Sequence, residues 1–227
     1  MTINNLKQSF IRQLEIACQT LSIELTKVKQ DHILEYLTQL LKWNKTYNLT
    51  AIRDPEQALV QHIFDSLAVI APIRTYFQSK QQTTKTVLDV GSGAGLPGVV
   101  IAIMLPETQV TCVDTVEKKM TFVRQVSGVL ALTNLAAIHQ RVELMDEEAY
   151  DIVVSRAFAS LKDFATLAGK RAKKDGNLLA MKGKIPHEEI VTLEEQTNWC
   201  VKSIESLEVP QLGAQRCLVW MKRKGRA

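Results

Sequence analysis

Hydrophobic and polar positions follow two different patterns in the first third and in the rest of the chain. In the first third, leucines, isoleucines and aromatic residues recur every three or four positions, as in residues 11–21 and 32–49. That spacing places the apolar side chains on one side of an α-helix. Asp54 and Pro55 are typical of an N-cap and a first helical turn, so another helix is expected after them. We predict a helical N-terminal region over residues 1–82.

After this region, short apolar runs alternate with helix-length segments, which indicates βαβ units and a largely parallel sheet with helices on both faces. The last two runs are separated only by a turn at residues 210–215, so the sheet is expected to finish with an antiparallel hairpin. The predicted fold class is α/β, with a Rossmann-like domain over residues 83–227. The apolar runs fall at residues 86–90, 109–114, 136–140, 150–155, 177–182, 202–209 and 216–222.

The composition mainly indicates which classes of protein and which kinds of site are not expected. Of 227 residues, 46% are hydrophobic and 23% are charged, the ordinary balance of a globular protein. The four cysteines form no C-x-x-C pair, so neither a disulfide framework nor a zinc site is expected. No apolar run approaches the roughly 20 residues of a membrane span, and the first residues lack the apolar core of a secretory leader. We expect a cytoplasmic protein without a metal or a membrane partner, and nothing in the sequence demands more than a monomer.

The net charge of +4 is mild, but the basic residues are clustered in residues 169–176 and 222–226, with Lys182 and Lys184 between. Such clusters can neutralise the phosphates of a nucleic acid, although most are solvated surfaces. The candidates for contact with a nucleic acid are Lys170, Arg171, Lys173, Lys174, Lys222, Arg223 and Lys224.

The stretch LDVGSGAGLPG, residues 88–98, directly follows the first apolar run of the second pattern. A Gly-rich turn between a parallel strand and a helix is a typical ligand-binding device, because glycine leaves no Cβ to obstruct a ligand. The dinucleotide fingerprint G-x-G-x-x-G would need a third glycine where Leu96 stands, so that fit fails. The pattern present is D-x-G-x-G-x-G, made by Asp89, Gly91, Gly93 and Gly95.

Two acids accompany this turn. A carboxylate at Asp89 favours a ligand with a positively charged end, such as the ammonium and sulfonium groups of S-adenosylmethionine, and would repel a pyrophosphate. The next apolar run ends in Asp114, where a carboxylate can accept both hydroxyls of a ribose. The second acid suits NAD and S-adenosylmethionine equally. Together the acids indicate a nucleoside site, with a purely structural turn as the alternative.

Three stretches together resemble a known family. They are LDVGSGAGLPG, SRAFASL at residues 155–161, and WNKTYNLTAI followed by QHIFDSL within residues 43–67. In this order they look like the RsmG (GidB) family of bacterial methyltransferases, which act on guanine N7 in small-subunit ribosomal RNA. The Gly-rich turn alone would indicate only a class I methyltransferase. The resemblance implies S-adenosylmethionine as the methyl donor and a guanosine in the 530 loop of 16S ribosomal RNA as the acceptor.

The resemblance also implies roles for particular residues. Val142 and Glu143 match a pair beside the adenine, and Arg156 matches an arginine in the cleft. Arg156 directly follows an expected parallel strand, where ligands gather and where an arginine can hold a phosphate or stack on a base. One departure is Lys119, where many members have arginine, and this change conserves charge. The positions that match the family's cofactor contacts are Gly91, Leu96, Asp114, Val142, Glu143 and Arg156.

The helical region contains further polar residues. His62 and Asp65 would share a helix face, and an acid–base pair there is imaginable. We interpret them instead as a buried histidine bonded to a carboxylate. Trp43, Asn44 and Asn48 are interpreted as residues that cap helices and pack the helical region onto the sheet, with RNA contact as the alternative.

Guanine N7 has an exposed lone pair and no proton, so the implied reaction needs in-line placement of the base and no general base. Consistent with this, the chain lacks the Asn-Pro-Pro signature of amine methylation, and Cys112 belongs to a strand and not to a nucleophile's position. Three rivals remain: a class I methyltransferase for another RNA or a small molecule, a nucleotide-binding regulatory module without catalysis, and a dehydrogenase, which Leu96 disfavours.

Overall fold

The structure is a computed structural model, and it describes residues 3–80, 84–145, 150–156 and 158–225. The predicted boundary between residues 82 and 83 lies outside the described residues, as do Ala157 of the stretch SRAFASL and Arg226 of the basic C-terminus. The division into two domains therefore stays a prediction.

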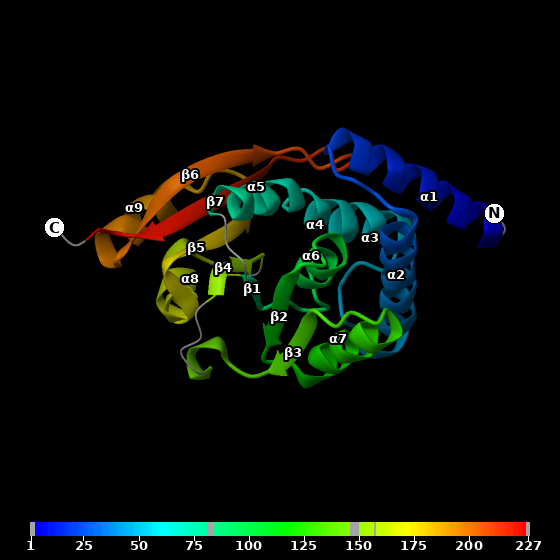
Figure 1. Cartoon of the computed structure of the whole chain (residues 1–227), viewed down its shortest axis with the longest axis horizontal. Coiled ribbons are helices and arrows are strands. Elements are labelled where there is room, and N and C mark those ends of the chain that lie inside the picture. Colours follow the sequence, from blue (N-terminus) through cyan, green and yellow to red (C-terminus); the bar gives the residue numbers. More distant parts are fainter. Residues whose placement is uncertain (1–2, 81–83, 146–149, 157, 226–227) are drawn as a thin grey trace.

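In the described part of the chain, seven strands form one mixed sheet in the order β3-β2-β1-β4-β5-β7-β6 (Figure 1). Strands β1 to β5 are parallel, whereas β7 is antiparallel to both of its neighbours. This arrangement confirms the predicted α/β class with an antiparallel C-terminal hairpin. The strands are β1 (Lys85–Val90), β2 (Thr108–Asp114), β3 (Leu135–His139), β4 (Tyr150–Ser155), β5 (Ala172–Lys182), β6 (Trp199–Leu207) and β7 (Arg216–Arg223).

Strand β5 begins earlier than the apolar run at residues 177–182 predicts. Tyr150 of β4 pairs with Ala172, but Ile152 pairs with Asn177, so residues 173–176 form a bulge between the two pairings. The bulge contains charged residues, which is why the hydrophobic pattern begins only after it.

The N-terminal region is helical, as its periodicity predicts. Asp54 caps a helix as expected, because its carboxylate accepts a hydrogen bond from the Gln57 N–H at 2.8 Å. A π-helical segment interrupts the last α-helical part, a local irregularity that periodicity did not predict. The elements are α1 (Ile3–Thr20), α2 (Lys27–Tyr47), α3 (Pro55–Ala58), the π-helix η1 (Leu59–Phe64), α4 (Asp65–Leu67) and α5 (Ile70–Lys80).

Helices cover both faces of the sheet because side chains along each strand alternate between two hydrophobic clusters. On β1, Val87 belongs to the cluster shared with the N-terminal helices, α6 and α7, and Leu88 to the cluster shared with α8 and α9. The N-terminal helices and one face of the sheet thus share a core. None of the described helices is long and apolar enough to cross a bilayer. The remaining elements are α6 (Gly98–Met104), α7 (Glu117–Val129), η2 (Val142–Leu144), α8 (Leu161–Ala168), η3 (Gly169–Arg171) and α9 (His187–Gln196).

The strand order defines where a ligand can enter. After β1 the chain continues to β2 and β3 on one side, whereas β4 lies on the other side of β1. In open α/β sheets, ligands bind beside the carboxyl ends of the strands at such a switch point. We call the edge where β1 to β5 end the carboxyl edge, and the edge where they begin the amino edge. The Gly-rich turn and Arg156 both leave the sheet at the carboxyl edge.

Candidate functional site

The glycines of the turn after β1 have two different functions. Gly91, Gly93 and Gly95 all have positive φ, at 65°, 59° and 91°. A Cβ on Gly93 would meet nothing within 4 Å, whereas a Cβ on Gly95 would lie 2.4 Å from Cγ2 of Val99. Gly93 therefore faces open space, and Gly95 allows the turn to pack against α6. The cofactor contact at Gly95 stays a prediction, because these distances show only that an added Cβ there would point toward Val99 and Val123.

Asp89 is 0% exposed and lies beneath the start of α6. One carboxylate oxygen accepts a hydrogen bond from the Gly98 N–H at 2.7 Å, and the other has no hydrogen-bond partner among the described residues. Burial raises the pKa of Asp89 to about 7, against the lowering effects of the Gly98 N–H and of Arg156. This position contradicts the predicted contact with a ligand's cationic end. The acid instead holds the first turn of α6 in place.

Asp114, at the end of β2, is next to the turn from the other side. Its carboxylate accepts hydrogen bonds from the N–H groups of Gly93 and Val116, both at 2.9 Å. The ammonium of Lys119 is 3.9 Å away, so the residue that departs from the family pattern supplies the same charge. These contacts fix the carboxylate beside the turn, and each oxygen keeps a lone pair for a ligand hydroxyl.

Two hollows open at the carboxyl edge and meet at Gly91. The strand-side hollow has a volume of about 270 Å³, and the helix-side hollow has a volume of about 140 Å³. The strand-side hollow is lined by Val90, Gly91, Val113, Asp114, Thr115, Gln140, Arg141, Val142, Glu143, Phe158 and Leu167. The helix-side hollow is lined by Leu49, Thr50, His62, Gly91, Ser92, Gly93, Ala94, Leu96 and Arg156.

The hollows bring together most of the residues that the sequence singled out. Asp114, Val142 and Glu143 line the strand-side hollow, and Leu96 and Arg156 line the helix-side hollow. The backbone of η2 carries Val142 and Glu143 directly after β3. An elongated ligand lying across Gly91 would reach both hollows, as a nucleoside with an attached amino-acid chain requires.

Sequence reasoning missed several lining residues. Phe158 and Gln140 reach the strand-side hollow from loops, and Thr50 reaches the helix-side hollow from the loop after α2. Phe158 and Thr50 stand within the stretches that carry the family resemblance, and that was the available signal. Gln140 lies at the end of an expected strand, where position alone did not distinguish it.

Arg156 is held at the helix-side hollow by the N-terminal helices. Its guanidinium donates to the Gln61 carbonyl at 3.2 Å and to the Asp65 carboxylate at 3.3 Å. Asp65 also accepts a hydrogen bond from Arg216, the first residue of β7, at 2.9 Å. The Asp65 side chain is 4% exposed and thus lies buried between two cations, one at each side. A partly buried pair of this kind orients Arg156 toward the hollow.

His62 is buried as predicted, but its predicted carboxylate partner is wrong. Its Nε2 lies 2.8 Å from the Thr50 hydroxyl, whereas Asp65 bonds the two arginines. Burial, together with the nearby Arg156, lowers the pKa of His62 to about 4. The imidazole is therefore neutral at physiological pH.

The N-terminal helices also support the turn directly. The Tyr36 hydroxyl on α2 donates to the Ala94 carbonyl at 2.8 Å. Trp43 packs against Phe122 of α7 with ring centroids 5.4 Å apart. Asn44 holds the loop after α2 by bonding the Thr50 N–H and the Ile52 carbonyl, both at 2.9 Å. These contacts confirm the predicted packing role of this segment.

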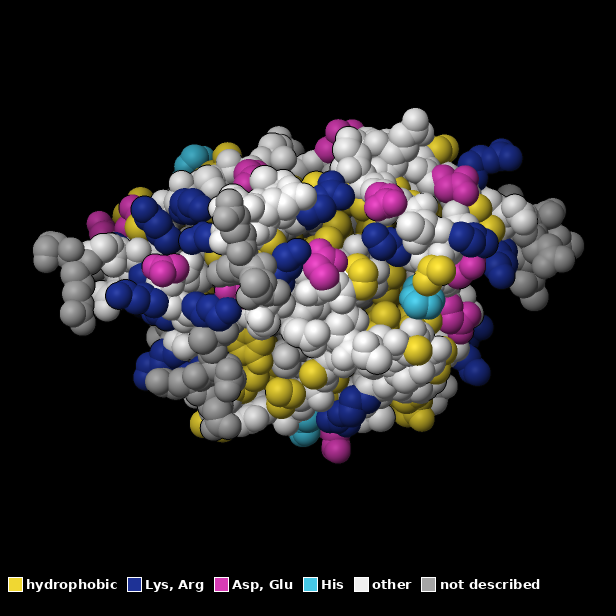
Figure 2. Space-filling model, in the orientation of Figure 1, with side chains coloured by type: hydrophobic (Ala, Val, Ile, Leu, Met, Phe, Trp, Pro, Cys, Tyr) yellow, Lys and Arg dark blue, Asp and Glu magenta, His cyan; other side chains and the backbone are white. Residues whose placement is uncertain are grey.

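Most of the basic candidates lie at the amino edge, away from the hollows. Lys170, Lys173 and Lys174 precede or occupy the bulge of β5, and Lys222 pairs with Cys200 near the start of β6. Figure 2 shows Lys and Arg side chains gathered toward the end of the molecule where Figure 1 places α9 and the C-terminus. Because β5 rises about 17 Å from Asn177 to Lys182, this cluster is far from the Gly-rich turn.

Several of these basic side chains are engaged within the protein. Arg171 is 3% exposed, and its guanidinium donates to the backbone carbonyls of Val142 and Met145. In contrast to the prediction, it does not offer its charge to RNA. The Arg223 guanidinium lies 4.6 Å from the Trp199 ring centroid, and the Lys173 ammonium lies 2.8 Å from the Asp151 carboxylate. Lys224 donates to backbone carbonyls beside α9.

No group of three or more His, Cys, Asp or Glu residues in the described ranges could hold a metal ion. Among the described residues, the two hollows are lined by backbone and apolar side chains, by the carboxylates of Asp114 and Glu143, by the cations of Arg141 and Arg156, and by neutral polar side chains such as that of Thr50.

Comparisons with known proteins agree with this geometry. The chain matches the model of the GidB family, described as rRNA small subunit methyltransferase G, over residues 29–219. It is 57% identical over 211 residues to the Ribosomal RNA small subunit methyltransferase G of Bordetella petrii, covering 93% of this chain and 82% of that protein. The protein of the same name from Methylibium petroleiphilum is 50% identical over 212 residues, with 93% and 94% covered.

Solved structures agree on the fold. A Burkholderia thailandensis 1,6-didemethyltoxoflavin-N1-methyltransferase, crystallised with S-adenosylhomocysteine, superposes with a TM-score of 0.55 at 14% identity over 89% of this chain and 92% of that chain. A SAM-dependent methyltransferase from Aquifex aeolicus gives a TM-score of 0.52 at 16% identity over 82% and 97%. At such identities the likeness shows the fold alone, and that fold is the class I methyltransferase fold. On the family match and the identity over most of its length, this chain belongs to the rRNA small subunit methyltransferase G family.

Proposed function

We propose that this chain transfers the methyl group of S-adenosylmethionine to N7 of a guanosine in the 530 loop of 16S ribosomal RNA. The observation that carries the proposal is the pair of hollows that meet at Gly91, at the switch point of the sheet. The names of its relatives, which are small-subunit ribosomal RNA methyltransferases, support the acceptor class. We infer that it acts as a monomer in the cytoplasm, where ribosomes are made.

The residues of the two hollows fit the cofactor. S-adenosylmethionine supplies a methyl group activated by a positively charged sulfur. In our proposal, Asp114 holds the ribose hydroxyls, and Val142 and Glu143 lie along the adenine in the strand-side hollow. Gly93, whose missing Cβ leaves open space, allows close approach to the backbone. The helix-side hollow, with Leu96 and Arg156, then takes the amino-acid end and the transfer site.

In this proposal, the residues of the chain bind and orient the cofactor and the acceptor guanosine, and no proton has to be removed from guanine N7. His62 is neutral at the helix-side hollow, so it adds no charge to repel the methyl donor. Burial raises the pKa of the Cys112 thiol well above its ordinary value, which makes it unsuited to act as a nucleophile. Catalysis in this proposal comes mainly from proximity and orientation, which can supply several kcal/mol.

The test uses methyl-labelled S-adenosylmethionine with assembled small subunits, free 16S ribosomal RNA and a mixture of small metabolites. We expect label in RNA, recovered as 7-methylguanosine at a single position. Arg156→Ala and Asp114→Asn are expected to lower kcat/KM at least tenfold, while Lys202→Glu, an exposed change on β6, leaves it within twofold. Label only in metabolites would favour a small-molecule methyltransferase, and bound cofactor without any transfer would favour a regulatory module.

A further inference from the structure

A third hollow lies at the carboxyl edge, on the far side of Arg156 from the Gly-rich turn. We call it the carboxyl-edge groove, and its volume is about 770 Å³. It opens where β5 ends, where α9 begins and where β7 begins. Its walls are residues 182–189 and 214–216. None of its lining residues lines the strand-side or the helix-side hollow.

A chain of ion pairs connects the groove with the helix-side hollow. Arg216 lines the groove and donates to Asp65 at 2.9 Å. The same carboxylate accepts from Arg156 at 3.3 Å, and Arg156 lines the helix-side hollow. One carboxylate therefore separates the groove from the place where a methyl acceptor would lie. A polymer that lies in the groove would therefore be next to the helix-side hollow at Arg156.

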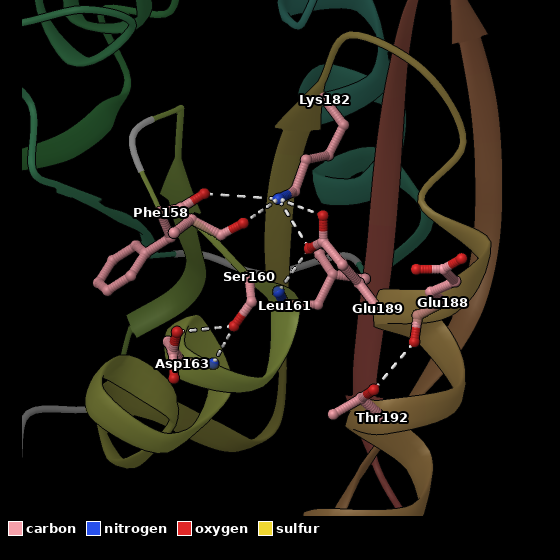
Figure 3. A network of polar contacts seen from close by, with 9 residues as sticks. Phe158, Ser160, Leu161, Asp163, Lys182, Glu188, Glu189 and Thr192 are labelled. Carbon is pink, nitrogen blue, oxygen red and sulfur yellow. Dashed lines mark hydrogen bonds and ion pairs between the residues drawn. The ribbon is translucent and has the colours of Figure 1, made fainter.

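At the other wall of the groove, polar contacts of Lys182 and Glu189 reach the loop that carries Phe158 (Figure 3). The Lys182 ammonium is 2.8 Å from the Glu189 carboxylate and donates to the carbonyls of Phe158 and Ala159 at 3.4 Å. Glu189 in turn accepts from the Leu161 N–H at 2.8 Å. The loop that these contacts fix carries Phe158, which lines the strand-side hollow. The groove is thus a fixed part of the same site and not a separate surface feature.

The lining of the groove suits a nucleic-acid strand. Lys184 is exposed and has no ion-pair partner among the described residues. Arg216 adds a second cation, whose guanidinium also pairs with the Asp65 carboxylate that it shares with Arg156. Lys182 and Glu189 neutralise each other, and Glu188 contributes one opposing charge. Ile185, Pro186 and Ala214 also line the groove and provide apolar surface between the charges. Cations for phosphates beside apolar surface for bases are the two features that single-stranded RNA binding uses.

We propose that the carboxyl-edge groove holds the RNA strand adjacent to the acceptor guanosine, with Lys184 and Arg216 facing its phosphates. This inference rests on the proposed function and specifies where the acceptor polymer lies. It also separates the groove from the basic cluster at the amino edge, which is about 17 Å farther along β5 from Lys182. A strand bound at the amino edge would have to cross the sheet before a base could reach Arg156.

The test compares Lys184→Glu with Lys202→Glu, a charge reversal of another exposed lysine that lies on β6 outside the groove. Methyl transfer to free small-subunit RNA gives KM and kcat, fluorescence anisotropy gives RNA affinity against salt, and calorimetry gives S-adenosylmethionine affinity. We expect Lys184→Glu to raise the KM for RNA about tenfold and to make the salt dependence less steep by about one phosphate contact. Its kcat and its affinity for S-adenosylmethionine should stay within twofold, as should all values for Lys202→Glu.

Three outcomes would overturn the inference while leaving the proposed function intact. They are equal KM values for Lys184→Glu and Lys202→Glu, a defect of Lys184→Glu confined to kcat, and a larger rise in KM for Lys222→Glu at the amino edge than for Lys184→Glu. If the wild-type chain transfers no methyl group to RNA, the proposed function fails. The anisotropy measurements then test RNA binding in the groove by themselves. Equal RNA affinities of Lys184→Glu and wild type would show that the groove does not bind the RNA strand.

Discussion

At the scale of one residue, Asp89 belongs to the Gly-rich motif, but its carboxylate has a structural role beneath α6. The sequence pattern places an acid before the glycines, and charge considerations suggested that it faces the ligand. The fold instead encloses it beneath α6, where its carboxylate meets the Gly98 N–H. Spacing along the chain fixes which residues are near the turn, but it does not tell which side chains point inward, because that depends on how α6 packs onto β1.

The raised pKa of Asp89 predicts a pH dependence of stability. The folded carboxyl has a pKa of about 7 and the unfolded one has its ordinary value of 3.8, so the folded state binds more protons between these values. Its contribution to the free energy of unfolding is therefore fully present below about pH 4 and is lost as pH rises through 7. Asp89→Asn should be closest to wild type in stability below about pH 4 and should gain stability relative to it as pH rises to 7.5, measured by urea unfolding.

The comparison of wild type with Asp89→Asn isolates this effect from other groups. His62, whose pKa is lowered to about 4, contributes with the opposite sign, because its stabilisation is lost as pH falls below 6.5. It is present in both proteins and cancels in the difference. A difference in stability between wild type and Asp89→Asn that stays flat as pH rises to 7.5 would contradict the burial of a carboxylate with a pKa of about 7.

At the scale of elements, the Gly-rich turn is built for close packing on one side and for access on the other. Gly95→Ala places a Cβ 2.4 Å from Val99 at a φ of 91°, and we expect a loss of roughly 2–5 kcal/mol from strain and overpacking. Gly93→Ala, also at positive φ but in open space, is the matched control and should cost about 1 kcal/mol. Thermal and urea unfolding give both values. Equal losses would show that backbone strain alone governs the turn.

Hydrophobic periodicity predicted the helices of the N-terminal region, the parallel strands and the final hairpin, because each of these buries one regular set of side chains. It missed the π-helix at residues 59–64 and the bulge at residues 173–176. Both are irregularities set by tertiary contacts. In the π-helical segment, the Gln61 carbonyl accepts a hydrogen bond from Arg156, which is 95 residues away in the sequence. His62 contacts Thr50, which is 12 residues away. Local sequence carries no sign of such partners.

At the scale of the whole molecule, strand order determines which predicted residues come together. Asp114, Val142 and Arg156 follow three different strands, and the parallel sheet brings all three to the carboxyl edge. Most of the basic candidates lie away from the hollows, because a cluster of charges in the sequence does not indicate which edge of the sheet it occupies. Lys170 and Lys222 lie at the amino edge, whereas Lys184, a less conspicuous lysine, lies beside the site.

The central claim is that one nucleoside ligand spans both hollows across Gly91. A crystal structure of the chain with S-adenosylhomocysteine tests it most directly. We predict the ribose within hydrogen-bond distance of Asp114, the adenine along Val142 in the strand-side hollow, and the amino-acid end beside Arg156. Density for the compound elsewhere, or no binding at concentrations that saturate related methyltransferases, would contradict the account.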